Sequence, residues 1–184
     1  MNVRKLLWGV FLPALIATAF AAPPAAALRK SPELAINDTT GKTTMLSSLR
    51  GKVVVVEFLF VRSQHCLRVA QTLNKLHAEL GSRGFQPVGI AFDAPNAAMT
   101  GGQYLSSMVE LLKITYPVGL AEKADVDTYL GRSGNETLSI PQVVVIDRAG
   151  NIRAVTGSQT NPSLEDEGSL RTLLDGLLKE EPKP

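Results

Sequence analysis

The chain has 184 residues, of which 45% are apolar and 20% charged, and this ordinary globular composition excludes the disordered, collagenous and coiled-coil classes. Its length suits one domain with a proper core better than two. A single cysteine excludes a disulfide framework within the chain.

The N-terminal residues have the layout of a secretory signal peptide. Two basic residues precede an apolar stretch over Leu6–Ala22, and small residues allow cleavage after Ala21 or after Ala27. The stretch is short for a membrane-spanning helix, which needs about 20 apolar residues, and Pro13 interrupts it. We therefore expect residues 1–27 to be a signal peptide and tether, and the mature protein to be periplasmic or secreted. Membrane attachment would require this segment to stay uncleaved.

Loss of this segment cancels the small positive charge of the chain. Arg4 and Lys5 leave with it, so that 17 basic and 17 acidic residues remain. A neutral mature protein offers no electrostatic case for binding nucleic acid or a membrane surface. We therefore expect no nucleic-acid partner.

The remaining residues, predicted as one domain over 31–180, alternate strands and helices. The run Lys52–Phe58 is nearly continuous in β-branched residues, which is typical of a strand buried on both faces. Cys66–Leu80 is the clearest helix, because its apolar residues recur every three or four positions along one stripe. The other predicted elements are strands at 33–37, 86–93, 116–120, 143–147 and 152–155, and helices at 99–112, 123–130 and 170–178.

The order of these elements predicts an α/β fold with a mixed sheet. The parallel strand–helix–strand part comes first. An antiparallel hairpin over 143–155 and a closing helix come last.

Cys66 stands where the buried strand passes into the first long helix. The free N–H groups and partial positive charge of a helix N-terminus stabilise a thiolate. Cys66 precedes Val69 by three residues and extends the apolar stripe, so its side chain is predicted to face inward. Ser63, three residues earlier, is predicted to be more exposed and to cap the helix. The alternative role of Cys66 is buried packing, which is common for free cysteines.

Three segments carry a family resemblance. The first segment is residues 41–49. The second is residues 51–58, which precede a four-residue motif that ends in a cysteine. The third begins at Ile140-Pro141, which precedes the strand at 143–147 and a turn at 148–150. In these segments the chain resembles the TlpA-like, AhpC-TSA redoxin branch of the thioredoxin-like superfamily. The resemblance covers residues 31–178. It implies a thioredoxin-like three-layer sandwich with a mixed central sheet and extra N-terminal strands.

The resemblance also implies roles for single residues. Members of this branch carry two motif cysteines, of which the first attacks a substrate disulfide and the second resolves the mixed disulfide. Here Ser63 stands at the attacking position and Cys66 at the resolving one, and Arg62 stands where a tryptophan is usual. His65 is similar to the histidine before the second cysteine of some oxidising members. Pro141, with Ile140, would be the cis-proline wall of a substrate groove.

The serine changes the expected chemistry. A hydroxyl cannot form a disulfide, and Cys66 alone would lack an intramolecular resolving thiol. A serine hydrolase is not expected, because no carboxylate in the local sequence orients His65. We therefore expect an exported monothiol relative of thiol–disulfide oxidoreductases, with Cys66, Ser63 and His65 at the reacting centre. Its partners would be protein or small-molecule thiols and disulfides, without a cofactor or metal.

Two alternatives stay open. One is a redox-inactive peptide-binding or chaperone-like module that uses the groove beside Pro141. The other is a one-cysteine peroxidase, because peroxiredoxins place Thr or Ser three residues before their peroxidatic cysteine. Two family features are missing for this second alternative: Leu59 stands at the position of a family proline, and Pro141-Gln142 stands where an arginine is expected.

Overall fold

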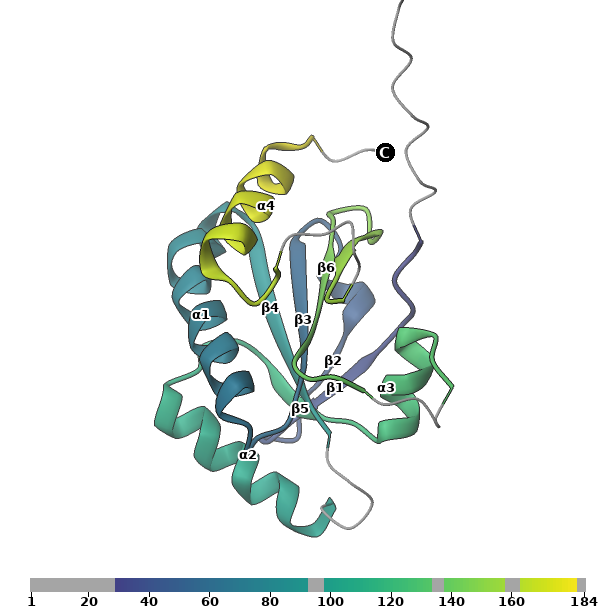
Figure 1. Cartoon of the computed structure of the whole chain (residues 1–184), viewed down its shortest axis with the longest axis vertical. Helices are drawn as coiled ribbons and strands as arrows, with labels where there is room; N and C mark the ends of the chain where they lie inside the picture. The colour runs from purple at the N-terminus through teal and green to yellow at the C-terminus, as the bar shows by residue number, and fades with distance from the viewer. Residues whose placement is uncertain (1–28, 93–97, 134–137, 158–162, 182–184) are drawn as a thin grey trace, which may run out of the picture.

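The computed structural model describes residues 29–92, 98–133, 138–157 and 163–181 (Figure 1). The predicted signal peptide lies outside these residues. Seven strands form one sheet in the order β2-β1-β5-β4-β3-β6-β7. The strands are β1 (Ala35–Asp38), β2 (Thr43–Met45), β3 (Val53–Leu59), β4 (Phe85–Ala91), β5 (Val118–Leu120), β6 (Gln142–Ile146) and β7 (Ile152–Val155). The helices are α1 (Gln64–Leu80), α2 (Ala98–Leu112), α3 (Lys123–Leu130) and α4 (Glu167–Lys179), with 3₁₀ turns η1 (Leu46–Leu49) and η2 (Gly81–Arg83).

Strand β3 forms the centre of the sheet. It pairs parallel with β4 and antiparallel with β6, and all seven of its residues are buried. Its β-branched run suits this position, because valine packs well on a pleated surface that is covered on both faces. The parallel β3–β4 pair is connected by α1, the predicted crossover helix.

Helices cover both faces of the sheet, as Figure 1 shows. On one face, α1, α2 and α4 contribute Val69, Leu105 and Leu170 to one apolar cluster. On the other face, α3 and η1 contribute Tyr129 and Leu46 to a second cluster. The three-layer α/β sandwich is therefore confirmed, with β1 and β2 as the extra N-terminal strands.

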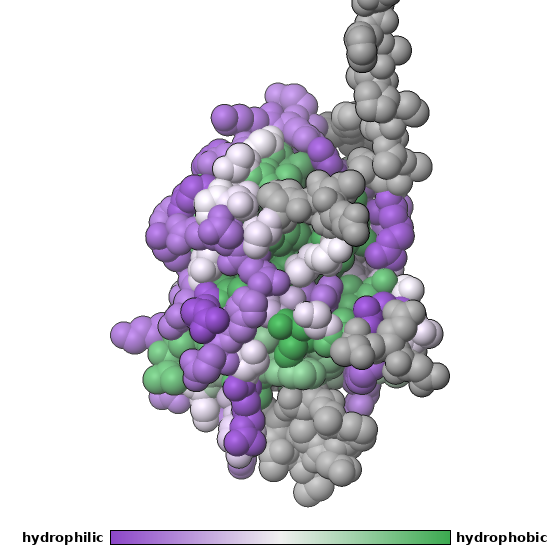
Figure 2. All heavy atoms as spheres, viewed as in Figure 1, coloured by the Kyte–Doolittle hydropathy of each residue, from purple (hydrophilic) through white to green (hydrophobic). Residues whose placement is uncertain are grey.

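The outer surface of α1 and α4 is hydrophilic in Figure 2. Ion pairs join the two helices there: Arg171 to Glu79 at 2.6 Å and Lys75 to Glu167 at 2.8 Å. Exposed pairs of this kind contribute about 0–1 kcal/mol each, so the apolar stripe of α1 matters more for its packing. No helix in the described part of the chain is long and apolar enough to cross a membrane.

Contacts extend to both ends of the described domain. At the N-terminal end, Arg29 and Lys30 pair with the segment that begins β7. The Ile152 N–H donates to the Arg29 carbonyl at 2.8 Å, and Lys30 forms an antiparallel bridge with Asn151. At the other end, Glu180 pairs with Arg153 of β7 at 2.6 Å.

Arg148 joins three segments beside the start of β3. Its Nη1 donates to the Gly51 carbonyl at 2.8 Å, and its Nη2 donates to the carbonyls of Arg83 at 3.1 Å and Leu178 at 3.3 Å. A Cβ at Gly84 would lie 2.9 Å from this Nη1, and Gly84 has φ +96°, so glycine is needed there. The planar guanidinium thus links the segment just before β3, the turn η2 and the end of α4.

Replacing Arg148 with lysine should lower the free energy of unfolding by about 1.5–3 kcal/mol, the usual worth of hydrogen bonds to a charged group. A single ammonium lacks the forked geometry that reaches all three carbonyls. Urea denaturation measures the loss. The exposed control Arg68→Lys should change stability by less than about 0.5 kcal/mol, and equal losses in the two variants would contradict this role.

Candidate thiol site

The candidate site lies where β3 ends and α1 begins. Ser63 is the N-cap of α1, with φ −87° and ψ 115°, and its Oγ accepts a hydrogen bond from the Cys66 backbone N–H at 3.4 Å. Cys66 is a free cysteine, is 0% exposed and faces the core with Val69 and Leu73. The spacing argument thus predicted both the inward thiol and the capping serine correctly.

Glu57 is the residue that the sequence analysis missed. It lies on β3 with its side chain on the same face as Val55 and Leu59, which belong to the cluster around Cys66. It is 0% exposed, and neither carboxyl oxygen has a hydrogen-bond partner within the structure. Burial raises the pKa of Glu57 well above its ordinary value. The signal was a charged residue inside a run predicted to be buried on both faces.

Tyr116 packs on the same side of the sheet as Glu57. Its hydroxyl donates to the Ala70 carbonyl of α1 at 3.3 Å. Burial raises the pKa of the Tyr116 hydroxyl well above its ordinary value, and the charge of Glu57 raises it further. Tyr116 therefore stays neutral. It lies just before β5 and packs in the same apolar cluster as Cys66.

The environment of Cys66 disfavours its thiolate. Burial raises the pKa of the Cys66 thiol, and the charge of Glu57 adds to the rise. Hydrogen bonds from the Ser63 hydroxyl and from the backbone at Phe60 and Cys66 oppose the rise without cancelling it. The stabilisation expected at a helix N-terminus is thus outweighed by desolvation.

His65 pairs with a carboxylate from a distant segment. Its Nε2 lies 2.8 Å from the Oε2 of Glu165, in the segment before α4. The carboxylate that the local sequence lacked therefore comes from 100 residues further along the chain. No hydrogen bond joins His65 to Ser63 or Cys66 among the described residues, so the arrangement does not form a hydrolase triad. Nor, within the described ranges, do three His, Cys, Asp or Glu side chains group to hold a metal ion.

The rim of the site includes Arg62 and Pro141. The guanidinium of Arg62 stacks on Tyr104 of α2, 5.3 Å from the ring centroid. The Ile140–Pro141 peptide bond is cis. Because Gln142 pairs with Phe58, Pro141 lies level with the end of β3 from which the chain leads to Ser63. The sheet thus brings the proline segment and the thiol motif to the same end.

Comparison with known proteins agrees with this arrangement. Residues 27–155, more than half of the chain, match the AhpC/TSA family. The chain belongs to the AhpC/TSA family. No protein of curated function matches it.

Solved structures share the fold of this AhpC/TSA-family chain. A thiol:disulfide interchange protein of the thioredoxin family from Chlorobium tepidum TLS aligns with TM-score 0.68 and 23% identity, covering 84% of this chain and 99% of that one. The thioredoxin domain of a thiol-disulfide oxidoreductase from Bacteroides vulgatus aligns with TM-score 0.61 and 20% identity, covering 82% and 99%. A thiol:disulfide interchange protein from a Bacteroides species gives 0.62 and 20%, covering 82% and 91%. These likenesses confirm the thioredoxin-like fold.

The buried carboxyl predicts an unusual dependence of stability on pH. Below the unfolded-state pKa of Glu57, near its ordinary 4.5, the group is protonated in both states. Above it the unfolded state loses the proton and the folded state retains it, so stability falls by about 1.4 kcal/mol per pH unit until the folded pKa is reached. Glu57→Gln should therefore gain stability over the wild type as pH rises from 5.

Urea denaturation at several pH values measures this difference. The control Glu110→Gln, at an exposed position of α2, should follow the wild-type profile. Parallel profiles for Glu57→Gln and the wild type would contradict the raised pKa of Glu57.

The reactivity of Cys66 provides a second test, with opposite effects expected from two neighbours. Ser63→Gly removes the hydroxyl that lowers the pKa of Cys66 but costs only a few tenths of a kcal/mol in capping. It should shift the pH midpoint of iodoacetamide alkylation upward. Glu57→Gln removes a charge that raises the pKa and should shift the midpoint downward. Mass spectrometry of the alkylated protein follows both, and shifts in the same direction would refute the assignment.

Proposed function

We propose that this AhpC/TSA-family protein is an exported single-thiol relative of thiol–disulfide oxidoreductases, which engages partner thiols and disulfides without completing a dithiol cycle. One observation carries the proposal: a half-buried serine caps α1, and the sole cysteine lies fully buried one helical turn behind it. The solved structures of similar fold that bear the name thiol:disulfide interchange protein support the substrate class.

The proposed chemistry has a single covalent step. The Cys66 thiolate attacks a partner disulfide, forming a Cys66–partner disulfide and releasing the other partner sulfur as a thiolate, which takes a proton from solvent. The chain has no second cysteine to resolve this adduct. A further thiol from outside must attack it to release Cys66. The adduct should therefore be long-lived, and the burial of Cys66 should make its formation slow.

The other site residues have supporting roles in this proposal. Ser63 holds the start of α1 and donates its hydroxyl toward the Cys66 sulfur. Pro141 and Ile140 form the wall against which an extended partner segment lies. His65, held by Glu165, fixes the loop before α4 at the edge of the site rather than moving a proton.

Export supports the same chemistry. Residues 1–27 have the pattern of a signal peptide, and disulfides persist in the oxidising compartments outside the cytoplasm. A lone thiol there meets disulfide-bearing partners.

A redox-inactive peptide-binding module is the second candidate. It is favoured by the complete burial of Cys66 and by the raised pKa of its thiol. A one-cysteine peroxidase is consistent with the family match, but it needs a reactive thiolate, which this environment disfavours.

Trapping of mixed disulfides separates these functions. The exported protein, incubated with an extract of envelope proteins, should form Cys66-dependent adducts that dithiothreitol releases and that Cys66→Ala abolishes. Ser63→Cys restores the second thiol and should bring insulin-reducing activity that the wild type lacks.

Three results would overturn the proposal. Partner retention by Cys66→Ala without any adduct in the wild type indicates the binding module. Consumption of hydroperoxide that Cys66→Ala abolishes indicates the peroxidase. An inactive Ser63→Cys variant with an accessible dithiol shows that the remaining site is not competent for exchange.

A further inference from the structure

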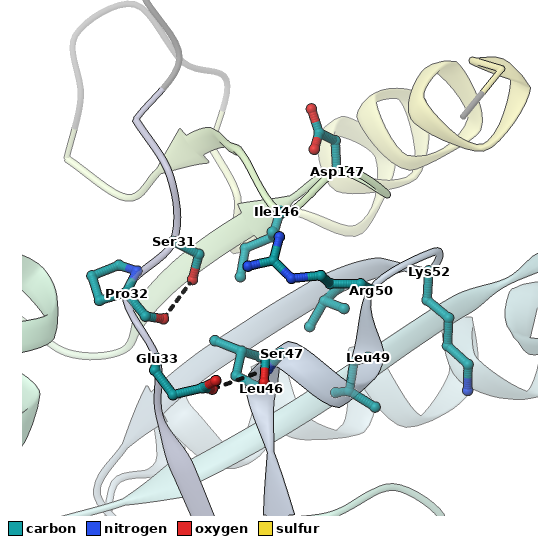
Figure 3. A pocket seen from close by; sticks show the side chains of 12 residues that line it. Ser31, Pro32, Glu33, Leu46, Ser47, Leu49, Arg50, Lys52, Ile146 and Asp147 are labelled. Atoms are coloured by element: carbon teal, nitrogen blue, oxygen red, sulfur yellow. Dashed lines mark hydrogen bonds between the residues drawn. The ribbon is translucent and has the colours of Figure 1, made fainter. Parts of the chain in front are cut away.

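A cavity of about 60 Å³ lies far from the thiol site (Figure 3). It opens beside Val54, near the start of β3, and Ile146, at the end of β6. Cys66 and Ser63 follow the other end of β3. Five strand residues at about 3.3 Å each separate the two ends, or about 17 Å. The cavity therefore takes no part in the thiol chemistry.

The floor of the cavity is apolar. The buried side chains of Leu46, Val54 and Ile146 line it, together with the half-buried Leu49. One water-sized sphere needs about 15 Å³, so the cavity holds about four such spheres. This volume suits a branched aliphatic group of about four carbons, which gains free energy by leaving water.

One side of the rim carries a fixed negative charge. The Oε1 of Glu33 accepts hydrogen bonds from the backbone N–H groups of Leu34 and Ser47, both at 3.0 Å. Although partial burial raises the pKa of Glu33, hydrogen bonds from Ser47 and Leu34 and the charge of Arg50 bring it below the ordinary value. A carboxylate offers about four acceptor sites, so Glu33 retains capacity for a ligand donor.

The other side of the rim carries a positive charge. Figure 3 shows Arg50 reaching across the pocket, with Glu33 on the facing side. The Nη1 of Arg50 donates to the Ala149 carbonyl at 3.0 Å. The guanidinium lies against Gly150, where a Cβ would clash with it and where φ is +81°. This bond uses one of the five N–H donors of the guanidinium.

We infer that this cavity binds a free aliphatic α-amino acid of the size of leucine. Its side chain would fill the apolar floor, its carboxylate would accept from Arg50, and its ammonium would donate to Glu33. The carboxylate of Asp147 also lines the pocket, but it already accepts hydrogen bonds from Asn151 and Arg153. A ligand with only one charge would meet a like charge at Glu33 or Arg50, whereas a zwitterion complements both. The inference is independent of the proposed function, because the two sites share no residue.

Titration of the ¹⁵N-labelled exported protein with L-leucine tests this inference. Saturable chemical-shift changes are expected at the backbone amides of Ser47, Arg50 and Gly150, with none at Cys66. Glycine, which lacks the aliphatic side chain, should bind at least tenfold more weakly. N-acetyl-L-leucine and leucinamide each lack one charge and should also bind at least tenfold more weakly.

Variants assign the rim charges. Arg50→Gln and Glu33→Gln should each weaken leucine binding at least tenfold. Arg68→Gln is the matched control, because Arg68 is exposed on α1 and does not line the pocket. It should bind leucine as the wild type does.

The inference is overturned if leucine causes no saturable shift, if glycine binds as well as leucine, or if the rim variants bind normally. Leucinamide that binds as tightly as leucine would identify a peptide N-terminus as the occupant, and N-acetyl-leucine that does so would identify a peptide C-terminus. Either result replaces the free amino acid.

Discussion

The burial of β3 is the constraint on which the rest of the structure depends. The strand is paired on both sides and covered on both faces, and its last residues lead directly into the cap of α1. A strand so enclosed leaves water no access to its side chains. Glu57 nevertheless lies within it, and its carboxyl oxygens have no hydrogen-bond partner among the residues that the structure describes. A buried polar group in this state costs about 1–3 kcal/mol on protein scales, so the fold tolerates it at the expense of stability, beside its only thiol.

Glu57 and Ser63 have opposite effects on the pKa of the Cys66 thiol. Burial and the charge of Glu57 raise the pKa of this thiol, whereas the Ser63 hydroxyl and the start of the helix favour loss of its proton. In a dithiol site the exposed sulfur would react first, and the buried one would receive the mixed disulfide. With serine at the cap, only the sulfur with the unfavourable environment is left. Membership of the AhpC/TSA family therefore indicates the ancestry of this site, but it does not indicate how fast the Cys66 thiol reacts.

The two ends of the sheet carry different groups of side chains. At the end where β3 leads into α1 lie the thiol, the cis Ile140–Pro141 bond and the Arg62–Tyr104 pair. At the other end, charged groups from distant segments face each other over an apolar floor. At that second end, Arg148 joins three segments by donating hydrogen bonds to three backbone carbonyls. A small core can thus support two independent surfaces, since each rests on a different end of the same strands.

The sequence by itself determined the α/β class, the order of the strands and helices apart from the short edge strand β2, the inward position of Cys66 and the capping role of Ser63. These follow from local periodicity and spacing, because residues three or four apart on a helix share a face. Only the tertiary structure decided that Glu57 is isolated beside Cys66, that Glu165 holds His65, and that Glu33 faces Arg50. Each of these relations rests on the packing of separate elements. Local patterns carry no information on such contacts, since they depend on strand order, register and the burial that results.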